Sequence, residues 1–170
     1  MVLEKYIGTM LGKMALEYYG LPYKMRHLCE EMCELFVAIS HNMRHKERGI
    51  NDEAIAEEIC DVLILIDEIW CVYGIQIGCM LENAKNSVSV PCQQENSMHA
   101  LAGMLIDACH STKNARRQQR EERMFINDMA ILINLIGDVL PEYKEKVDAY
   151  WMQKRYRLCE RIGVSKELAA

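Results

Sequence analysis

Two pairs of acidic residues at helical spacing are the part of this sequence best suited to chemistry. They are Glu31 with Glu34, and Glu58 with Asp61. Residues three apart on a helix share a face, with Cβ atoms about 5–6 Å apart, so the charges of each pair repel. Burying such carboxylates without a cation is unfavourable. Because only oxygen ligands are offered, the pairs predict a site for Mg²⁺, or Mn²⁺, rather than zinc or copper.

Asp61 is the most informative of the four acids. It follows Ile59 and Cys60 and precedes Val62 in an apolar helical segment, where Asp has a low helix propensity and no capping role. The alternative is that the glutamates form an ordinary solvated helix face. The position of Asp61 argues against that interpretation, because an ionised Asp there needs a cation or hydrogen-bond donors.

The elements that must position these acids are helices, and the sequence predicts an all-α bundle of about six. Apolar residues recur at helical spacing, and only three prolines and nine glycines interrupt them. The two acidic helices are predicted to bury apolar stripes: Met25, Leu28, Met32, Leu35, Phe36 and Ile39 on the first, and Ile55, Ile59, Val62, Leu63, Ile66 and Ile69/Trp70 on the second. Gly74 is expected to end one helix, and Pro141 to begin the last, where proline is tolerated. The predicted helices are 2–19, 22–45, 52–73, 76–85, 97–110, 115–139 and 142–162.

The chain is predicted to have two helical halves packed as one domain. Residues 1–86 carry the acidic pairs, residues 87–96 form a Ser-, Asn- and Pro-containing linker, and residues 97–170 form a supporting half. Both halves place a basic loop before a long apolar helix, which is typical of a degenerate internal duplication. The second half lacks the acidic pairs, so an unrelated set of helices is an equally open interpretation.

Composition excludes several classes of function. The 170 residues carry a net charge of −5, so there is no basic footprint for a nucleic acid polymer. No apolar run approaches the roughly 20 residues of a membrane span, and the N-terminal residues do not resemble a signal peptide. We therefore expect a cytoplasmic protein that binds no membrane.

The eight cysteines are interpreted as reduced, small apolar residues that are mostly buried on helices. Cys29 and Cys33 are one helical turn apart and lie near His27 and His41. Together they suggest a zinc site, but their spacing matches no standard zinc motif. The structural interpretation is therefore preferred.

The acidic pairs also carry a family resemblance. The chain reads Glu30-Glu31-Met-Cys-Glu34, a spacer, and then Glu57-Glu58-Ile-Cys-Asp61. This pattern resembles the MazG-like nucleoside triphosphate pyrophosphohydrolases of the all-α superfamily, over residues 20–86. Tyr73-Gly74-Ile and Lys85-Asn86 are similar to later positions of that family, but the arginine expected soon after the lysine is missing.

The resemblance implies a four-helix core and Mg²⁺-dependent hydrolysis of a nucleoside triphosphate to the monophosphate and pyrophosphate. A homodimer is expected because a four-helix site can need helices from a neighbour and Met-rich apolar faces need to be covered. It implies metal ligation by Glu31, Glu34, Glu58 and Asp61, with Glu31 or Glu34 as the general base. The missing arginine and the degenerate second half keep an alternative open. This alternative is a non-catalytic helical module that binds a nucleotide or another protein.

A triphosphate also needs cationic partners. Arg44, Lys46 and Arg48 lie between the acidic helices, and Lys85 lies downstream, so these four are the predicted phosphate-binding residues. Lys154 and its neighbours Arg155 and Arg157 are further candidates. The sequence does not identify the nucleotide base.

Overall fold

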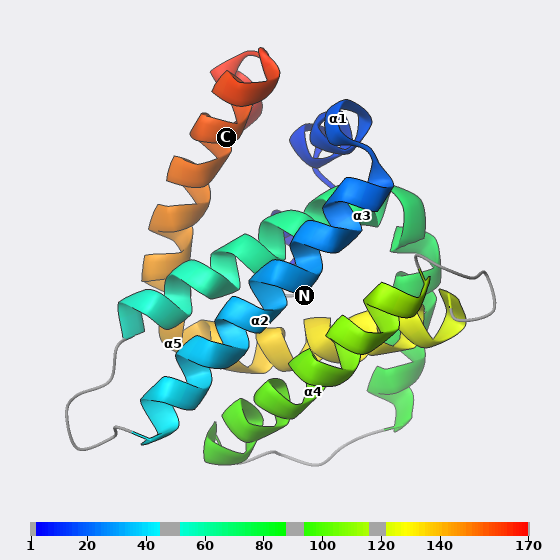
Figure 1. Cartoon of the computed structure of the whole chain (residues 1–170), viewed down its shortest axis with the longest axis vertical. Helices are drawn as coiled ribbons and strands as arrows, with labels where there is room; N and C mark the ends of the chain where they lie inside the picture. Colours follow the sequence, from blue (N-terminus) through cyan, green and yellow to red (C-terminus); the bar gives the residue numbers. More distant parts are fainter. Residues whose placement is uncertain (1–2, 45–51, 88–93, 116–121, 170) are drawn as a thin grey trace.

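A computed structural model of the chain describes residues 3–44, 52–87, 94–115 and 122–169. All regular structure in these residues is helical, which confirms the all-α prediction, with five α-helices in place of the expected six or so. The α-helices are α1 (Met10–Tyr19), α2 (Leu21–Arg44), α3 (Asp52–Ser87), α4 (Gln94–Ala115) and α5 (Glu122–Ile162). Two short 3-10 helices, η1 (Glu4–Tyr6) and η4 (Lys166–Ala169), lie near the ends of the chain (Figure 1).

The apolar stripes predicted on the two acidic helices are the faces that α2 and α3 bury. The apolar residues of the α2 stripe lie in the core apart from Phe36, which is half-buried. In the apolar stripe of α3 only Trp70 is half-buried, and the other stripe residues are buried. Helix α2 packs against both α3 and α4. Because the acids alternate with these stripes, packing of α2 on α3 carries their carboxylates to the edge of the shared interface.

Helix α3 does not end at Gly74, so the predicted break into two helices is wrong. The helix continues to Ser87 and changes direction about halfway along (Figure 1). Gly74 is buried against Trp70, and a Cβ atom at this position would lie 2.5 Å from the indole Nε1. The glycine therefore serves close packing of a bulky ring, which a sequence cannot distinguish from a helix end.

Helix α5 likewise runs through Pro141 without a break, so the predicted separate helices 115–139 and 142–162 are wrong. In Figure 1 the helix turns sharply where its colour passes from yellow to orange. Proline removes one backbone hydrogen bond and bends a helix, and burial of both flanks keeps the helix continuous. The bend directs the later part of α5 toward the N-terminal helices, where it packs against α3.

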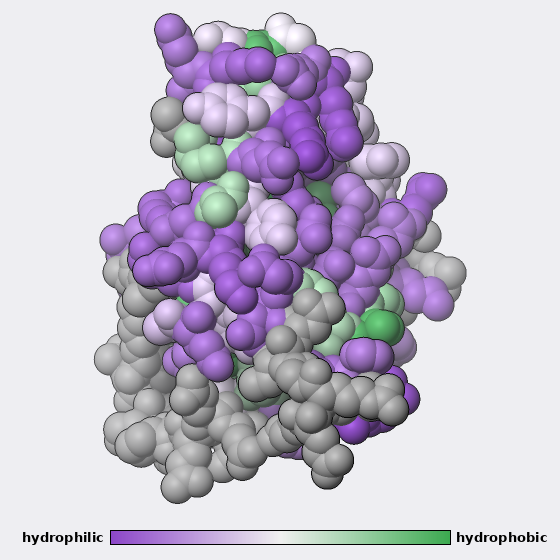
Figure 2. All heavy atoms as spheres, turned by 90° about the vertical axis from the view of Figure 1, so that its left-hand side faces the viewer, coloured by the Kyte–Doolittle hydropathy of each residue, from purple (hydrophilic) through white to green (hydrophobic). Residues whose placement is uncertain are grey.

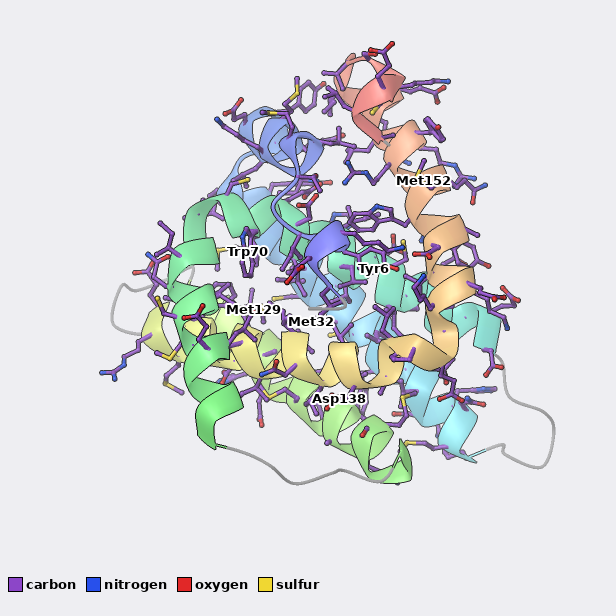
Figure 3. All side chains as sticks on the ribbon, turned by 180° about the vertical axis from the view of Figure 1, so that it is seen from behind. Tyr6, Met32, Trp70, Met129, Asp138 and Met152 are labelled. Atoms are coloured by element: carbon purple, nitrogen blue, oxygen red, sulfur yellow. The ribbon has the colours of Figure 1, made fainter. Side chains whose placement is uncertain are left out.

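One hydrophobic core joins residues from both predicted halves. Met32 of α2 and Met129 of α5, labelled in Figure 3, are both fully buried in it. Helices α3 and α4 extend into the predicted linker from either side, to Ser87 and from Gln94, and residues 88–93 lie outside the described part.

Asp52–Glu82 and Glu122–Ile162 are long and apolar enough to cross a membrane, and half of each apolar window is buried inside the protein.

The N- and C-terminal segments are joined around a buried arginine. The first helix begins at Met10 rather than at the predicted Val2, because the Thr9 side chain caps it by accepting from the Gly12 N–H at 3.1 Å. The Asp67 carboxylate accepts from the Thr9 N–H at 2.7 Å. Arg155 donates to the Thr9 hydroxyl at 2.9 Å and to the Leu168 carbonyl at 2.8 Å, which binds η4 to α1.

Candidate metal centre

The structure brings three of the four predicted metal ligands together. One carboxylate oxygen each from Glu31 and Glu34 of α2 and Glu58 of α3 lie within 4.8 Å of one another. We call these three side chains the carboxylate cluster. Among the described residues they are the one group of three or more His, Cys, Asp or Glu side chains that is this close. Oxygen donors in this number suit a hard divalent cation.

Glu58 shows the electrostatic cost of the cluster. Burial, followed by the charges of Asp61, Glu34 and Glu31, raises its pKa from 4.5 to about 7. Its Oε2 atom is buried and has no hydrogen-bond partner among the described residues. The charge of Lys154 lowers the pKa of Glu58 but does not offset burial and the neighbouring acids, so a bound cation would stabilise the ionised carboxylate further.

Glu31 is shared between the cluster and a histidine one helical turn earlier. The His27 Nε2 atom lies 2.8 Å from the Glu31 Oε1 atom. This hydrogen bond is the main cause of a raised pKa for His27, which burial partly offsets. Glu31 therefore has a side-chain partner, whereas Glu34 is exposed at the rim of the cluster.

Asp61 does not join the other three acids, although the sequence predicted all four to share one site. Its carboxylate accepts a short hydrogen bond from the Lys154 ammonium of α5, and Glu57 lies 3.3 Å from the same ammonium. Burial raises the pKa of Asp61 although Lys154 opposes this. The lysine provides the positive charge that this half-buried Asp requires, and the bend of α5 brings it to the site.

A pocket of about 210 Å³ adjoins the carboxylate cluster between α2, α3 and the later part of α5. Of the carboxylate cluster only Glu31 lines this pocket, beside Asp61, whereas Glu34 and Glu58 line a separate surface groove. Lys154, Arg157 and Arg161 line its basic side, at a spacing that places them along one face of α5. The pocket thus sets a row of cations opposite carboxylates, an arrangement that suits an anionic ligand bound together with a metal ion.

Two tyrosines and a buried ion pair form the end of this pocket near α1. The rings of Tyr19 and Tyr23 lie nearly parallel, with 5.4 Å between centroids. The Lys24 ammonium lies 2.7 Å from a Glu68 carboxylate oxygen and 4.2 Å from the centre of the Tyr19 ring. Both members of the ion pair are almost fully buried, so this wall of the pocket is held by a charge pair that excludes water.

The predicted phosphate-binding residues lie elsewhere or outside the described part. Arg44 is exposed at the end of α2, and its Nε atom donates to the Ser40 carbonyl at 3.2 Å. Lys46 and Arg48 lie outside the described residues. Lys85 belongs to α3, but its side chain is also outside the described part.

The basic row was only partly anticipated. Lys154 and Arg157 were secondary candidates in the sequence, Arg161 was missed, and Arg155 supports the C-terminal segment instead of the pocket. The usable signal was the helical spacing of Lys154, Arg157 and Arg161, which together face one side. Figure 2 shows the side of the molecule where the later part of α5 lies, and hydrophilic residues cover most of its coloured surface.

No protein family, curated protein or solved structure matches the chain. The site therefore has to be interpreted from its own residues and from the pattern of acids described above.

Proposed function

We propose that the chain hydrolyses a nucleoside triphosphate to the monophosphate and pyrophosphate, using Mg²⁺ or Mn²⁺ at the carboxylate cluster. The observation that supports this most directly is the meeting of Glu31, Glu34 and Glu58 oxygens within 4.8 Å, with the Glu58 Oε2 atom buried and unpaired among the described residues. The similarity of the acidic pairs to the MazG-like pattern supports the same reaction.

The residues fit a hard divalent cation. All three donors are carboxylates, which Mg²⁺ and Mn²⁺ prefer. A pKa of about 7 for Glu58 means that a proton and a cation compete for this group near neutral pH. When bound, the ion would neutralise phosphate oxygens and lower the pKa of a coordinated water.

The side chains around the cluster are proposed to accept the proton of the attacking water and to bind the phosphates. Glu34 is exposed and Glu31 is hydrogen-bonded to His27, so Glu34 is the better candidate to accept a proton from the attacking water. Lys154, Arg157 and Arg161 replace Arg44, Lys46, Arg48 and Lys85 as our preferred phosphate ligands, because they line the pocket beside Asp61.

The tyrosine end of the pocket is the proposed location of the nucleoside. Tyr19 and Tyr23 offer aromatic surface at the pocket wall, and a purine or pyrimidine has a face that packs on such rings. The buried Lys24–Glu68 pair holds the adjoining wall in place. The basic row extends from Lys154, beside Asp61, to Arg161, whose charge acts on Tyr19, so the phosphates would lie along this row between the acids and the base.

One observation favours the alternative of a non-catalytic nucleotide-binding module. Lys154 already neutralises Asp61, so the four carboxylates do not converge as a single ligand set. A protein that no longer hydrolyses nucleotide would retain the fold, with the Lys154 ammonium beside Asp61 in place of a metal ion. Such a protein would bind nucleotide through the basic row without releasing pyrophosphate.

The deciding experiment measures pyrophosphate release from a panel of ribo- and deoxyribonucleoside triphosphates with Mg²⁺ and with Mn²⁺. Glu34→Gln is expected to abolish release and retain the helical circular dichroism signal. Glu82→Gln, which alters an exposed glutamate on α3, is the matched control and is expected to keep the wild-type rate. Calorimetric nucleotide binding by the wild type with no pyrophosphate release would support the non-catalytic module, and an active Glu34→Gln variant would refute the assigned site.

A further inference from the structure

We propose that Cys33 of α2 and Cys109 of α4 form a dithiol that a low-molecular-weight disulfide, such as oxidised glutathione, converts reversibly to an intramolecular disulfide. The two Sγ atoms lie 3.8 Å apart although 75 residues separate the cysteines along the chain. Neither sulfur belongs to the carboxylate cluster, but Cys33 lines a groove together with Glu34 and Glu58, so the modification site adjoins the proposed metal centre.

The helices hold both thiols in place for this bond. Helix α2 packs directly on α4, and the cysteines face one another across that interface. The Cys29 thiol, one turn earlier on α2, donates to the Cys109 carbonyl at 3.6 Å, and the Cys109 thiol donates to the Cys29 carbonyl at 3.8 Å. Bond formation requires the sulfurs to approach from 3.8 Å to about 2.05 Å, so the cysteine side chains must rotate toward one another.

An oxidant has access to the pair. Cys33 is exposed and Cys109 is half-buried. Among the seven described cysteines only Cys60 and Cys159 are buried, so the expectation that they are mostly buried is wrong. Both thiols line a surface groove of about 590 Å³ between α2 and α4. A small disulfide can therefore reach Cys33 first, and Cys109 is placed to complete the bond.

The exchange is balanced in two steps. The Cys33 thiolate attacks one sulfur of oxidised glutathione, the glutathione S–S bond breaks, and one glutathione leaves as a thiolate that takes up a proton. The Cys109 thiolate then attacks the Cys33 sulfur and displaces the second glutathione. Two protein thiols lose two electrons and two protons, and one glutathione disulfide becomes two thiols.

The pair is expected to react slowly and to be governed by its equilibrium. Cys109 is half-buried, so a glutathione molecule reaches it less readily than it reaches the exposed Cys33. Proximity of the two sulfurs favours the second step over further mixed disulfides. The test therefore uses samples equilibrated in glutathione buffers of defined ratio.

Peptide mapping identifies the bond without ambiguity. After equilibration, remaining thiols are alkylated at acidic pH and the protein is digested with a glutamyl endopeptidase. Cleavage at Glu31 and Glu34 separates Cys33 from Cys29, and cleavage at Glu95 separates Cys92 from Cys109. The expected product is the peptide of residues 32–34 joined to that of residues 96–121.

Cysteine-to-serine variants identify which two thiols form the disulfide. Cys33→Ser and Cys109→Ser are each expected to lose the linked peptide. Cys29→Ser, and the matched control Cys79→Ser at an exposed position on α3, are expected to keep it. The cross-link closes a loop of roughly 75 residues, so oxidation should also raise the denaturant midpoint of the wild type and of Cys29→Ser, but not of Cys33→Ser.

Three results would overturn the proposal. The first is a wild-type protein that remains fully reduced in strongly oxidising glutathione buffer. The second is a stable glutathione adduct on Cys33 without the linked peptide, which would show that Cys109 does not resolve it. The third is a bond between Cys29 and Cys109 that persists in Cys33→Ser.

Discussion

Replacing Glu58 by Gln should stabilise the metal-free protein and abolish its stabilisation by metal. Gln has the shape of a protonated Glu, so the substitution removes the charge that burial, Asp61, Glu34 and Glu31 disfavour. A pKa moved from 4.5 to about 7 corresponds to about 3 kcal/mol of lost stability when the group is ionised. Solvent screening at this partly exposed cluster reduces the expected gain to about 1–2 kcal/mol.

The pH dependence has a defined sign. Between pH 4.5 and about 7, folded Glu58 keeps a proton that the unfolded chain has released, so the free energy of unfolding falls as pH rises through this window. Glu58→Gln removes this dependence. Its advantage over the wild type should therefore be absent at pH 4 and fully developed at pH 8.

Urea unfolding followed by circular dichroism, with a chelator and at both pH values, measures these differences. Mg²⁺ at one hundred times its dissociation constant should then stabilise the wild type by about 2.7 kcal/mol and leave Glu58→Gln unchanged. Glu82→Gln, at an exposed position on the same helix, controls for loss of a glutamate charge. Equal stabilities of wild type and Glu58→Gln at pH 8 in chelator would refute the electrostatic reasoning.

Three further substitutions test the charges around the pocket. Lys24→Met leaves the fully buried Glu68 without its cation and should lower the free energy of unfolding in urea by about 3–5 kcal/mol. The double variant Lys24→Met/Glu68→Leu should recover most of this loss, and additive losses would contradict a paired role. Lys154→Met should tighten Mn²⁺ binding about three- to tenfold in calorimetry, because a positive charge beside Asp61 is removed, and unchanged or weaker binding would contradict this. A lysine at position 155 cannot reproduce the planar set of hydrogen bonds that holds η4, so the free energy of unfolding of Arg155→Lys should fall by about 2 kcal/mol. A variant as stable as the wild type would show that these bonds contribute little.

Periodic patterns in the sequence were sufficient for the fold class and for much of the core. Leu28, Met32, Leu35 and Ile39 recur at the spacing of one helix face, and all four are buried as predicted. Helical periodicity is a local property, so it can be recognised without knowing which helix packs on which. The same local spacing identified Glu31 with Glu34 and Glu58 with Asp61 as pairs.

The ends of the helices could not be predicted from local sequence patterns. Gly74 and Pro141 both look like helix ends in the sequence, and both lie inside continuous helices. Gly74 makes room for the Trp70 ring, and the tertiary packing of α5 outweighs the hydrogen bond that Pro141 removes. The Trp70–Gly74 contact spans only four residues but exists only in a helix that already continues through Gly74, and the packing of α5 depends on distant parts of the chain.

By itself, then, the sequence determined that the chain is helical, which faces its helices bury, and that two neighbouring helices carry acidic pairs. Tertiary structure alone decided which acids meet: Glu31, Glu34 and Glu58 converge, and Asp61 turns to Lys154. Helical spacing places residues around one axis, whereas contacts between residues far apart in the chain depend on how the helices cross and bend. The bend of α5 is what brings a lysine 93 residues away to the half-buried Asp61.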